Sequence, residues 1–323
     1  MTTVLVTDKV NLSGLHPLTD DDLYSVVSID DSAGEEFFSA LEAAQALIVR
    51  SATTVSSELI SRASALKAIG RAGVGVDNVD IPAASERGIA VFNAPGGNTL
   101  AAAELTVGLI LSLARKIPQA DASLRSGRWD RAEFKGVELA GKTLGLMGAG
   151  RIGGEVAVRC RAFAMDVLVY DPYLSASRAD ELGAELVGLE VVLERADFIS
   201  IHVPLSDETR GIVGADALAA MKTTAFVVNA SRGGVVDEEA LATALVDGVI
   251  AGAALDVYER EPLDSDSPLR QAPNLVLTPH LGASTAEAQE GVATEVAEKI
   301  KTMFETGDVS TAVNAADLAD RAP

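Results

Sequence analysis

Three side chains of this sequence have the chemistry needed to move a proton and to hold a carboxylate, and each follows an apolar run. His280, one of only three histidines, comes directly after the run Leu275–Thr278. Histidine is the side chain whose unperturbed pKa lies near neutrality, which makes His280 a candidate for proton transfer. By position alone, a strand-end histidine that caps backbone groups is the better interpretation. Two further features reverse that preference: an Arg and a Glu at the ends of earlier apolar runs, and a glycine-rich motif at Gly148.

Arg232 and Glu261 each lie just beyond the carboxyl end of a predicted parallel strand, where ligands bind in open α/β sheets. The planar guanidinium of Arg232 offers paired donors that can hold a carboxylate and polarise an adjacent carbonyl. A hydrogen bond from Glu261 to one imidazole nitrogen would fix the tautomer of His280 and favour the imidazolium, so that the pair can shuttle a proton. A surface salt bridge for Arg232 and a solvated loop acid for Glu261, with Glu259 as a close competitor, remain the alternatives.

The glycine-rich motif is Gly148-Ala149-Gly150-Arg151-Ile152-Gly153, between the strand-like run Thr143–Met147 and a helical segment. Its first glycine permits a tight turn, its second lets the backbone approach a pyrophosphate, and its third allows close helix packing, while the helix N-terminus attracts phosphate. Asp171 ends the next strand 18 residues beyond Gly153, near the roughly 20 expected for the acid that binds the ribose hydroxyls. The context predicts a dinucleotide site that favours NAD over NADP, against the alternative of a glycine-rich turn without a ligand.

Short β-branched runs alternate with helical patterns along almost the whole chain. Alternation of this kind predicts parallel sheets covered by helices, and eleven strands are too many for one sheet of usual size. A chain of 323 residues also suggests about two domains. The predicted strands are Val4–Thr7, Ser25–Ile29, Ala46–Val49, Lys67–Gly70, Ala90–Phe92, Thr143–Met147, Val167–Tyr170, Phe198–Ile201, Ala225–Asn229, Gly252–Leu255 and Leu275–Thr278.

Two helices are expected to connect the sheets. An apolar helix from about Asn98 to Lys116, ended by Pro118, would cross from one sheet to the other. A capping box, Ser284-Thr285-Ala286-Glu287, opens a last long helix with Val292, Val296, Ile300 and Phe304 on one face. No strand follows this helix, so it could return to pack on the first domain and make that domain discontinuous. The Ala-rich tail after Asn314 is expected to fray.

Composition excludes several partners. The balance of 26 basic against 47 acidic residues gives a net charge of −21, which repels nucleic-acid phosphates and anionic lipids. No run reaches transmembrane length and the N-terminus has no signal-peptide pattern, so we expect a cytoplasmic protein. The single cysteine, Cys160, has no ligand-spaced neighbours, fits a reducing compartment and predicts no metal site.

Long motifs in a fixed order extend a resemblance over nearly the whole chain. With the glycine-rich motif and His280, they make the sequence similar to the D-isomer-specific 2-hydroxyacid dehydrogenase family, and to its phosphoglycerate-oxidising branch. The resemblance implies an α/β fold in which a Rossmann NAD-binding domain at 99–282 is inserted into a discontinuous flavodoxin-like substrate domain at 1–98 and 283–323. The motifs are Leu47-Ile48-Val49-Arg50-Ser51-Ala52-Thr53, Gly70-Arg71-Ala72-Gly73-Val74-Gly75-Val76-Asp77-Asn78-Val79-Asp80, Asn93-Ala94-Pro95-Gly96-Gly97-Asn98 and His280-Leu281-Gly282-Ala283-Ser284-Thr285.

The same resemblance assigns residues to the expected site. It implies a catalytic set of Arg232, Glu261 and His280. For the cofactor NAD it implies contacts from Gly148, Gly150, Arg151, Ile152, Gly153, Asp171, Val203, Ala230, Ser231, Asp256, Gly282 and Ala283. For a small anionic substrate, a phosphorylated 2-hydroxy acid, it implies Arg50, Arg71, Val74, Gly75 and Asn98, with Arg131 reaching over from a partner subunit.

The implied reaction is oxidation of 3-phospho-D-glycerate to 3-phosphooxypyruvate, the first step of L-serine biosynthesis, in a homodimer or homotetramer. A hydroxypyruvate or glyoxylate reductase of the same family is the alternative, because such relatives share all three catalytic residues. A non-catalytic, NAD-sensing corepressor is an alternative of a different class. Members of the phosphoglycerate branch often continue into C-terminal regulatory domains, whereas this sequence stops soon after its last helix. It is either a naturally short form or a truncated one, and we expect no feedback by serine in the sequence given.

Overall fold

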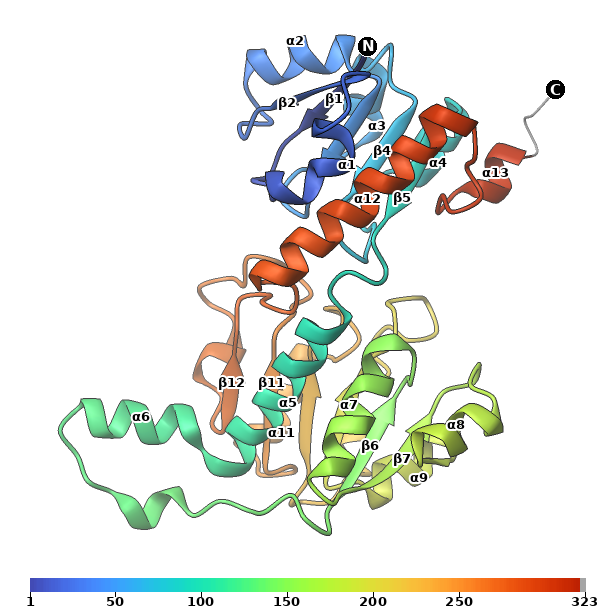
Figure 1. Cartoon of the computed structure of the whole chain (residues 1–323). Coiled ribbons are helices and arrows are strands. Elements are labelled where there is room, and N and C mark those ends of the chain that lie inside the picture. Colours follow the sequence, from blue (N-terminus) through green and yellow to red (C-terminus); the bar gives the residue numbers. More distant parts are fainter. Residues whose placement is uncertain (320–323) are drawn as a thin grey trace. The chain divides into compact units, whose positions relative to one another are not determined.

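The chain forms two units, which the computed structural model describes for residues 1–319. Unit 1 comprises Met1–Thr99 together with the chain from Ala283 onward, and unit 2 comprises Leu100–Gly282 (Figure 1). Each unit contains one sheet whose strand pairs are all parallel. Among the described residues, no helix has the length and apolar character needed to cross a membrane.

Unit 1 has a five-stranded sheet in the order β2-β1-β3-β4-β5, with helices on both faces. Alternate residues of each strand enter opposite cores: Val4 and Val6 pack with α12, whereas Leu5 packs with α2 and α3. The elements are β1 (Thr2–Val6), η1 (Leu12–Leu15), α1 (His16–Thr19), β2 (Tyr24–Ser28), α2 (Glu35–Ala43), β3 (Ala46–Val49), α3 (Ser57–Arg62), β4 (Ala68–Arg71), α4 (Ile81–Glu86), β5 (Ala90–Asn93), α12 (Ala286–Thr306) and α13 (Ala315–Ala319).

Unit 2 has a seven-stranded sheet in the order β12-β11-β10-β9-β6-β7-β8. Renumbered within the unit, this order is 3-2-1-4-5-6 with one added edge strand, the arrangement of Rossmann dinucleotide-binding sheets. The elements are α5 (Thr99–Arg115), α6 (Ile117–Arg125), η2 (Arg131–Phe134), β6 (Thr143–Met147), α7 (Arg151–Ala162), β7 (Asp166–Tyr170), α8 (Ala176–Leu182), β8 (Glu185–Leu186), α9 (Leu189–Arg195), β9 (Phe198–Ile201), α10 (Ala215–Ala219), β10 (Phe226–Asn229), α11 (Glu238–Val246), β11 (Gly252–Leu255), η3 (Pro268–Gln271) and β12 (Leu275–Leu277).

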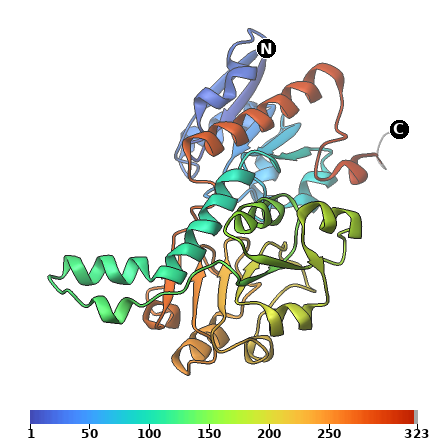
Figure 2. The ribbon, with the colours of Figure 1, turned by 60° about the horizontal axis from the view of Figure 1, so that its bottom comes forward.

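An arm formed by α6 and the segment through η2 projects from the sheet of unit 2 (Figures 1 and 2). The sequence predicted the preceding helix from about Asn98 to Lys116, and α5 (Thr99–Arg115) agrees with these bounds. The expectation that Pro118 ends this helix was wrong. The break is at Lys116, whose backbone is left-handed (φ 53°), and Pro118 lies in the first turn of α6. Proline fits there because the N–H groups of a first helical turn have no partner within the helix.

The last long helix, α12, packs on unit 1 through Val292, Val296 and Ile300. Its cap differs from the expected capping box by one residue: the N-cap is Thr285, whose hydroxyl accepts a hydrogen bond from Ala288 N at 3.1 Å. Either residue can cap a helix, because both carry a hydroxyl, and the spacing alone does not choose between them.

The Ala-rich tail after Asn314 was expected to fray, and through residue 319 that expectation was wrong, because Ala315–Ala319 form α13 and Asp317 accepts from Ser85 Oγ at 3.1 Å. Residues 320–323 lie outside the described residues. Asn314 is buried and pairs with the edge strand β5, accepting from Val91 N at 2.9 Å and donating to Ile89 O at 2.9 Å. Val313 N also donates to Val91 O at 2.7 Å. These bonds cover the exposed edge of the sheet and hold the chain up to α13.

Candidate active site and dinucleotide site

The glycine-rich turn connects β6 to α7 in unit 2. Gly148 has a left-handed backbone (φ 89°), and a Cβ on Gly153 would lie 2.3 Å from the carbonyl oxygen of Gly148. Only glycine at 153 therefore lets the helix start this close to the turn. Gly150 occupies the N-cap position of α7, where no side chain accepts a hydrogen bond from the helix amides. A Cβ added to Gly150 would meet nothing within 4 Å. The turn leaves open space beside uncapped helix amides of Arg151 and Ile152, which fits a pyrophosphate.

Asp171 ends β7 beside this turn. One carboxylate oxygen accepts from Ala149 N at 3.0 Å and the other accepts from Tyr173 N at 2.9 Å. These bonds fix the carboxylate next to the glycine-rich turn while leaving it further acceptor capacity for ribose hydroxyls. The residues present therefore fit a dinucleotide with an unmodified ribose.

His280 and Glu261 are in direct contact. The imidazole Nδ1 lies 2.6 Å from Glu261 Oε2, and the two side chains are 42% and 37% exposed. With Nδ1–H donating to the carboxylate, Nε2 is left to exchange a proton with a substrate hydroxyl. Partial burial raises the pKa of Glu261, but the His280 hydrogen bond, the Tyr258 amide and the Arg232 charge outweigh it, and the net pKa lies below its usual value.

Arg232 lies on the turn after β10, close to the loop that carries Glu261. A Cβ on the next residue, Gly233, would lie 1.7 Å from Tyr258 O, so the two loops touch through bare backbone. Asn229 shapes the turn: its Oδ1 accepts from Ser231 N at 3.0 Å and its Nδ2 donates to Arg232 O at 2.9 Å. The arrangement places a guanidinium, a carboxylate and an imidazole at one edge of one sheet.

The turn that carries His280 is held by Asp256, which is fully buried. Its carboxylate accepts from Thr278 Oγ1 at 2.6 Å, Leu281 N at 2.7 Å and Gly282 N at 2.9 Å. The backbone of His280 is left-handed (φ 54°), a strained conformation for a non-glycine residue, and its N–H donates to Asp256 O at 2.9 Å. Besides the cofactor contact expected of it, Asp256 thus positions the His280 turn.

The remaining expected cofactor residues lie on neighbouring loops of unit 2, with one exception. Val203 follows β9, and Ala230 and Ser231 follow β10. Gly282 ends unit 2, whereas Ala283 belongs to unit 1. Behind the glycine-rich turn lies His202, whose Nε2 is 2.8 Å from Ser200 Oγ; desolvation lowers its pKa to about 4, so it is neutral at physiological pH.

Unit 1 holds five of the six expected substrate residues: Arg50, Arg71, Val74, Gly75 and Asn98. Arg50 directly follows β3, and Arg71 is the last residue of the neighbouring strand β4. The carbonyl oxygen of Val74 accepts a hydrogen bond from Asn93 Nδ2 at 2.6 Å. The Oδ1 atom of Asn98 is buried without a hydrogen-bond partner in the described chain. Arg131 is exposed on the arm of unit 2.

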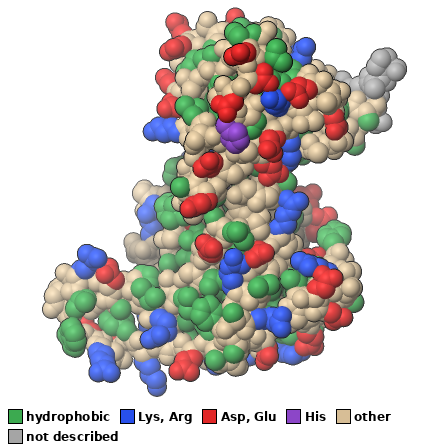
Figure 3. Space-filling view, viewed as in Figure 1, with side chains coloured by type: hydrophobic (Ala, Val, Ile, Leu, Met, Phe, Trp, Pro, Cys, Tyr) green, Lys and Arg blue, Asp and Glu red, His purple; other side chains and the backbone are tan. Residues whose placement is uncertain are grey.

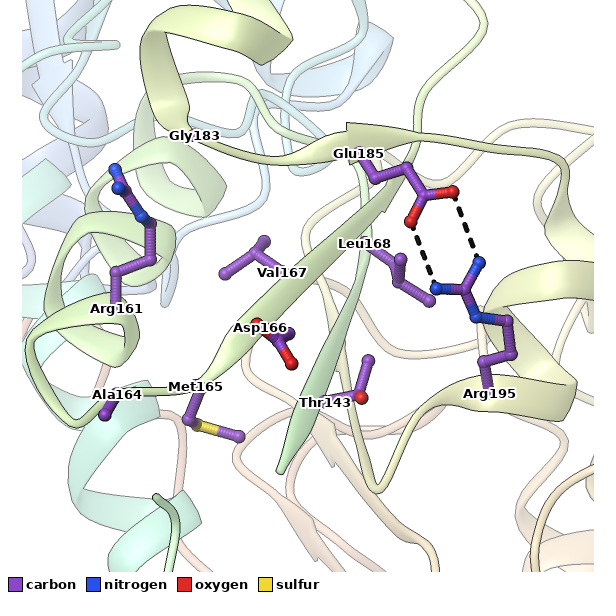
Figure 4. Close-up of a pocket in the computed structure, with 10 residues that line it drawn as sticks. All are labelled: Thr143, Arg161, Ala164, Met165, Asp166, Val167, Leu168, Gly183, Glu185 and Arg195. Atoms are coloured by element: carbon purple, nitrogen blue, oxygen red, sulfur yellow. Dashed lines mark hydrogen bonds and ion pairs between the residues drawn. The ribbon is translucent and has the colours of Figure 1, made fainter. Parts of the chain in front are cut away.

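A separate hollow of about 540 Å³ lies at the opposite, amino ends of β6 and β7 (Figure 4). Its walls include an ion pair between Arg195 and Glu185 at 3.1 Å, and it contains none of the expected site residues. Within residues 1–319, no group of three or more His, Cys, Asp or Glu side chains could hold a metal ion.

Sequence reasoning missed the residues that position the site rather than form it. Asn229 holds the turn that carries Arg232. The turn of His280 is held by Thr278 and by Tyr258, whose hydroxyl donates to Thr278 O at 2.8 Å. For Asn229 a signal was present, because an asparagine at a strand end often folds the next turn over its own side chain.

Comparison with known proteins gives a consistent family. Residues 107–282 match the model of the D-isomer specific 2-hydroxyacid dehydrogenase, NAD binding domain, which indicates a nicotinamide cofactor. Over 280 residues the chain is 51% identical to the D-3-phosphoglycerate dehydrogenase of Archaeoglobus fulgidus, covering 87% of this chain and 53% of the relative. The chain spans 53% to 58% of the length of the curated relatives it matches at 46% to 51% identity.

Solved structures with the same fold cover nearly the whole chain. The TT0316 protein of Thermus thermophilus superposes with a TM-score of 0.87 at 36% identity, covering 97% of this chain and 100% of that one. The NADPH-dependent glyoxylate/hydroxypyruvate reductase of Sinorhizobium meliloti superposes with a TM-score of 0.83 at 32% identity, covering 98% and 97%. The fold, the glycine-rich turn and the family match agree, and the chain belongs to the D-isomer-specific 2-hydroxyacid dehydrogenase family.

Proposed function

We propose that the protein is a D-3-phosphoglycerate dehydrogenase, which oxidises 3-phospho-D-glycerate to 3-phosphooxypyruvate with NAD as the first step of L-serine biosynthesis. The observation that carries the chemistry is the 2.6 Å contact between His280 Nδ1 and Glu261 beside Arg232. The substrate assignment is supported by the 51% identity to the curated Archaeoglobus relative of that name. A single cysteine also fits the reducing cytoplasm.

The dinucleotide would be held by the residues of the glycine-rich turn and by Asp171. The pyrophosphate would approach Gly150 and the amides of Arg151 and Ile152, and Asp171 would accept from the ribose hydroxyls while repelling a 2′-phosphate. When bound, NAD supplies the hydride acceptor for the substrate carbon. The other residues proposed to line this site are Gly148, Gly153, Val203, Ala230, Ser231, Asp256, Gly282 and Ala283.

The proton chemistry belongs to His280, Glu261 and Arg232. Nε2 of His280 would accept the proton of the C2 hydroxyl during oxidation and return it during reduction. Glu261 would hold Nδ1–H and stabilise the imidazolium that forms. Arg232 would bind the substrate carboxylate through its paired donors and polarise the carbonyl next to it.

The anionic ends of the substrate are assigned to unit 1, as the substrate domain, and to the arm. The backbone at Val74 and Gly75 would bind the carboxylate, with Asn98 nearby, and Arg50 and Arg71 would bind the phosphate. Arg131 would be contributed by a second copy of the chain. These roles favour a phosphorylated acid over hydroxypyruvate or glyoxylate, the substrates named for the Sinorhizobium neighbour.

One assay separates these possibilities: NADH oxidation with 3-phosphooxypyruvate, hydroxypyruvate, glyoxylate and pyruvate, measured side by side. We expect kcat/KM for the phosphorylated acid to exceed the others by at least about a hundredfold, because only that acid offers Arg50 and Arg71 a phosphate to bind. Activity confined to unphosphorylated acids would leave the hydroxyacid dehydrogenase chemistry and reject the substrate. NAD-dependent peptide binding without turnover, unchanged by His280→Ala, would instead support the corepressor.

We further propose that the protein is a homodimer or homotetramer that associates through the arm. Leu124 and Trp129 on the arm are 57% and 82% exposed, and exposed apolar side chains that gather on one part of a surface mark interaction sites. Hydrophobic side chains gather on the arm in Figure 3, whereas basic and acidic side chains are interspersed on the face in view. Sedimentation equilibrium of the wild type and of Leu124→Glu tests this proposal, since a monomeric wild type would reject it.

A further inference from the structure

The loop at residues 50–53 occupies a special place in unit 1. It follows β3, and β3 and β1 are the neighbouring strands at which the strand order 2-1-3-4-5 reverses direction. In open α/β sheets, ligands bind outside the carboxyl ends of the strands at this switch point. Two side chains from other loops at the same edge, Asp8 after β1 and Asn78 after β4, bind this loop.

Asp8 satisfies donors at both ends of the loop. One carboxylate oxygen accepts from Arg50 N at 2.8 Å and from Thr53 N at 3.0 Å, and the other accepts from Thr53 Oγ1 at 2.6 Å. The side chain of Thr53 is buried, so these bonds are shielded from water on that side. Hydrogen bonds to an ionised carboxylate are stronger than those between neutral groups.

Asn78 satisfies the acceptors of the same two residues. Its Nδ2 donates to Arg50 O at 2.7 Å and to Thr53 O at 2.7 Å. The loop is thus closed by five hydrogen bonds from two side chains, and both its first and last residues are fixed. No bond within the loop itself is needed to define its shape.

The bonds from Asp8 and Asn78 leave hydrogen-bond donors available at the tip of the loop. Ser51 and Ala52 are exposed, and their N–H groups have no acceptor anywhere in residues 1–319. The guanidinium of Arg50 likewise makes no ion pair or hydrogen bond with any side chain or carbonyl of the described chain. Neighbouring backbone amides beside a guanidinium form a site for a phosphate or carboxylate oxygen.

We propose that Asp8 and Asn78 are positioning residues that hold the loop at 50–53 in its anion-binding conformation, and so set the selectivity for a phosphorylated substrate. This inference rests on the proposed function, in which Arg50 binds the phosphate. Neither side chain touches the substrate. Each acts by ordering the loop before the substrate arrives. Binding of the phosphate then does not carry the conformational-entropy cost of ordering the loop.

The test compares 3-phosphooxypyruvate with hydroxypyruvate, which lacks only the phosphate, in wild type, Asp8→Ala and Asn78→Ala. We expect each substitution to raise KM for the phosphorylated acid by about tenfold, with kcat and KM for hydroxypyruvate within about twofold of wild type. A merely structural role would instead change kcat or KM for both acids alike. Asp8→Asn keeps one acceptor oxygen, so its KM should lie between those of wild type and Asp8→Ala.

The matched control is Asp31→Ala. Asp31 lies in the same unit and also accepts a loop amide, Ala33 N at 3.0 Å, but within residues 1–319 it makes no hydrogen bond or ion pair with the loop at 50–53. Its KM ratio for the two acids should equal that of wild type. Should Asp8→Ala not fold, Asp8→Asn and Asn78→Ala carry the same comparison.

A double-mutant cycle identifies the route of the effect. If Asp8 acts through the Arg50 loop, Asp8→Ala should add little to the KM increase of Arg50→Ala, whereas independent effects would multiply. Multiplying effects, or an unchanged KM ratio in both Asp8→Ala and Asn78→Ala, would overturn the inference while leaving the proposed function intact. A wild type without preference for the phosphorylated acid would reject the proposed function itself.

Discussion

The left-handed turn at His280 is held by a buried carboxylate on its backbone side and by Glu261 on its imidazole side. A proton-transfer residue fixed in this way needs little reorganisation when the substrate binds. We therefore expect His280→Ala to lower kcat by roughly 100- to 10,000-fold, as for a lost general acid or base, while NADH still binds to the glycine-rich turn. Steady-state kinetics and NADH fluorescence titration measure the two quantities.

The control for that substitution is His16→Ala. His16 opens the short helix α1 of unit 1, and its Nδ1 lies 3.3 Å from the Ser13 carbonyl oxygen, an exposed local contact. Its replacement should leave kcat unchanged. Turnover of His280→Ala within a few-fold of wild type would remove His280 from the proton-transfer step.

Glu261 links the site to pH. Burial raises its pKa, but the bonds from His280 and the Tyr258 amide and the Arg232 charge hold the net pKa below 4.5. A carboxyl group with a lowered pKa in the folded state stabilises the fold above its unfolded pKa, and this stabilisation is lost as the pH falls through the folded value. The free energy of unfolding should therefore decrease below about pH 4.5 more steeply in wild type than in Glu261→Gln.

Urea unfolding between pH 6 and the acid limit of the fold checks this expectation. The difference in unfolding free energy between wild type and Glu261→Gln should be largest near pH 6 and shrink with acidification. A difference that stays constant across the range would show that the carboxylate of Glu261 gains nothing from its partners.

Among the elements, the start of α7 contains two glycines with different roles. Gly153 is needed for packing, and Gly150 is proposed to leave room for the cofactor. A Cβ on Gly153 would lie 2.3 Å from Gly148 O, whereas one on Gly150 would meet nothing. Gly153→Ala should thus lower the unfolding temperature, because the helix must move away from the turn. Gly150→Ala should unfold like wild type yet weaken NADH binding, because its methyl group occupies the space proposed for the pyrophosphate. Calorimetry and fluorescence titration together test the pair, and equal losses of stability would contradict it.

The same helix buries the single cysteine. Cys160 has no exposed surface, and desolvation raises the pKa of its thiol to about 12. Because the thiolate is the reactive form, the native protein should not react with a thiol-specific disulfide reagent at neutral pH, and one thiol per chain should appear in denaturant. Rapid labelling of the native protein would show that α7 opens readily.

An element could be predicted from the sequence when enough of its residues form a recognisable apolar pattern. All eleven expected strands are present, because each is a short run rich in β-branched or other apolar residues between helical patterns. The missed strand β8 has two residues, Glu185 and Leu186, both exposed, so no apolar pattern marks it. The end of α5 was predicted correctly, but its cause was not: the left-handed backbone of Lys116 ends the helix, and Pro118 lies in the first turn of the next one. The capping box was one residue off, since backbone angles rather than composition decide where a helix begins.

For the site, the structure shows where the predicted side chains lie, whereas their roles stay predictions. Arg232, Glu261 and His280 stand in recognisable motifs at strand ends, and the structure brings Glu261 and His280 into contact. The side chains that hold loops escaped notice because their partners are distant in sequence: Asp8 binds an amide 42 residues away. Such pairs follow from strand order in the sheet, which no local pattern encodes.

For the whole molecule, the net charge of −21 is the dominant feature. Like charges destabilise a folded chain by mutual repulsion, and at about 0.1 M salt this repulsion is screened beyond roughly 10 Å. Salt also weakens surface ion pairs, but several of the described pairs are exposed, such as Arg125 with Asp121, and contribute little. The repulsion therefore outweighs the ion pairs, and the unfolding temperature should rise as KCl is added from low concentration to about 1 M. Differential scanning calorimetry measures the change. KCl is used rather than a sulfate salt, because sulfate would add strong salting-out to the screening. A flat or falling unfolding temperature would mean that the local ion pairs, and not the overall acidic charge, decide the electrostatic stability of this protein.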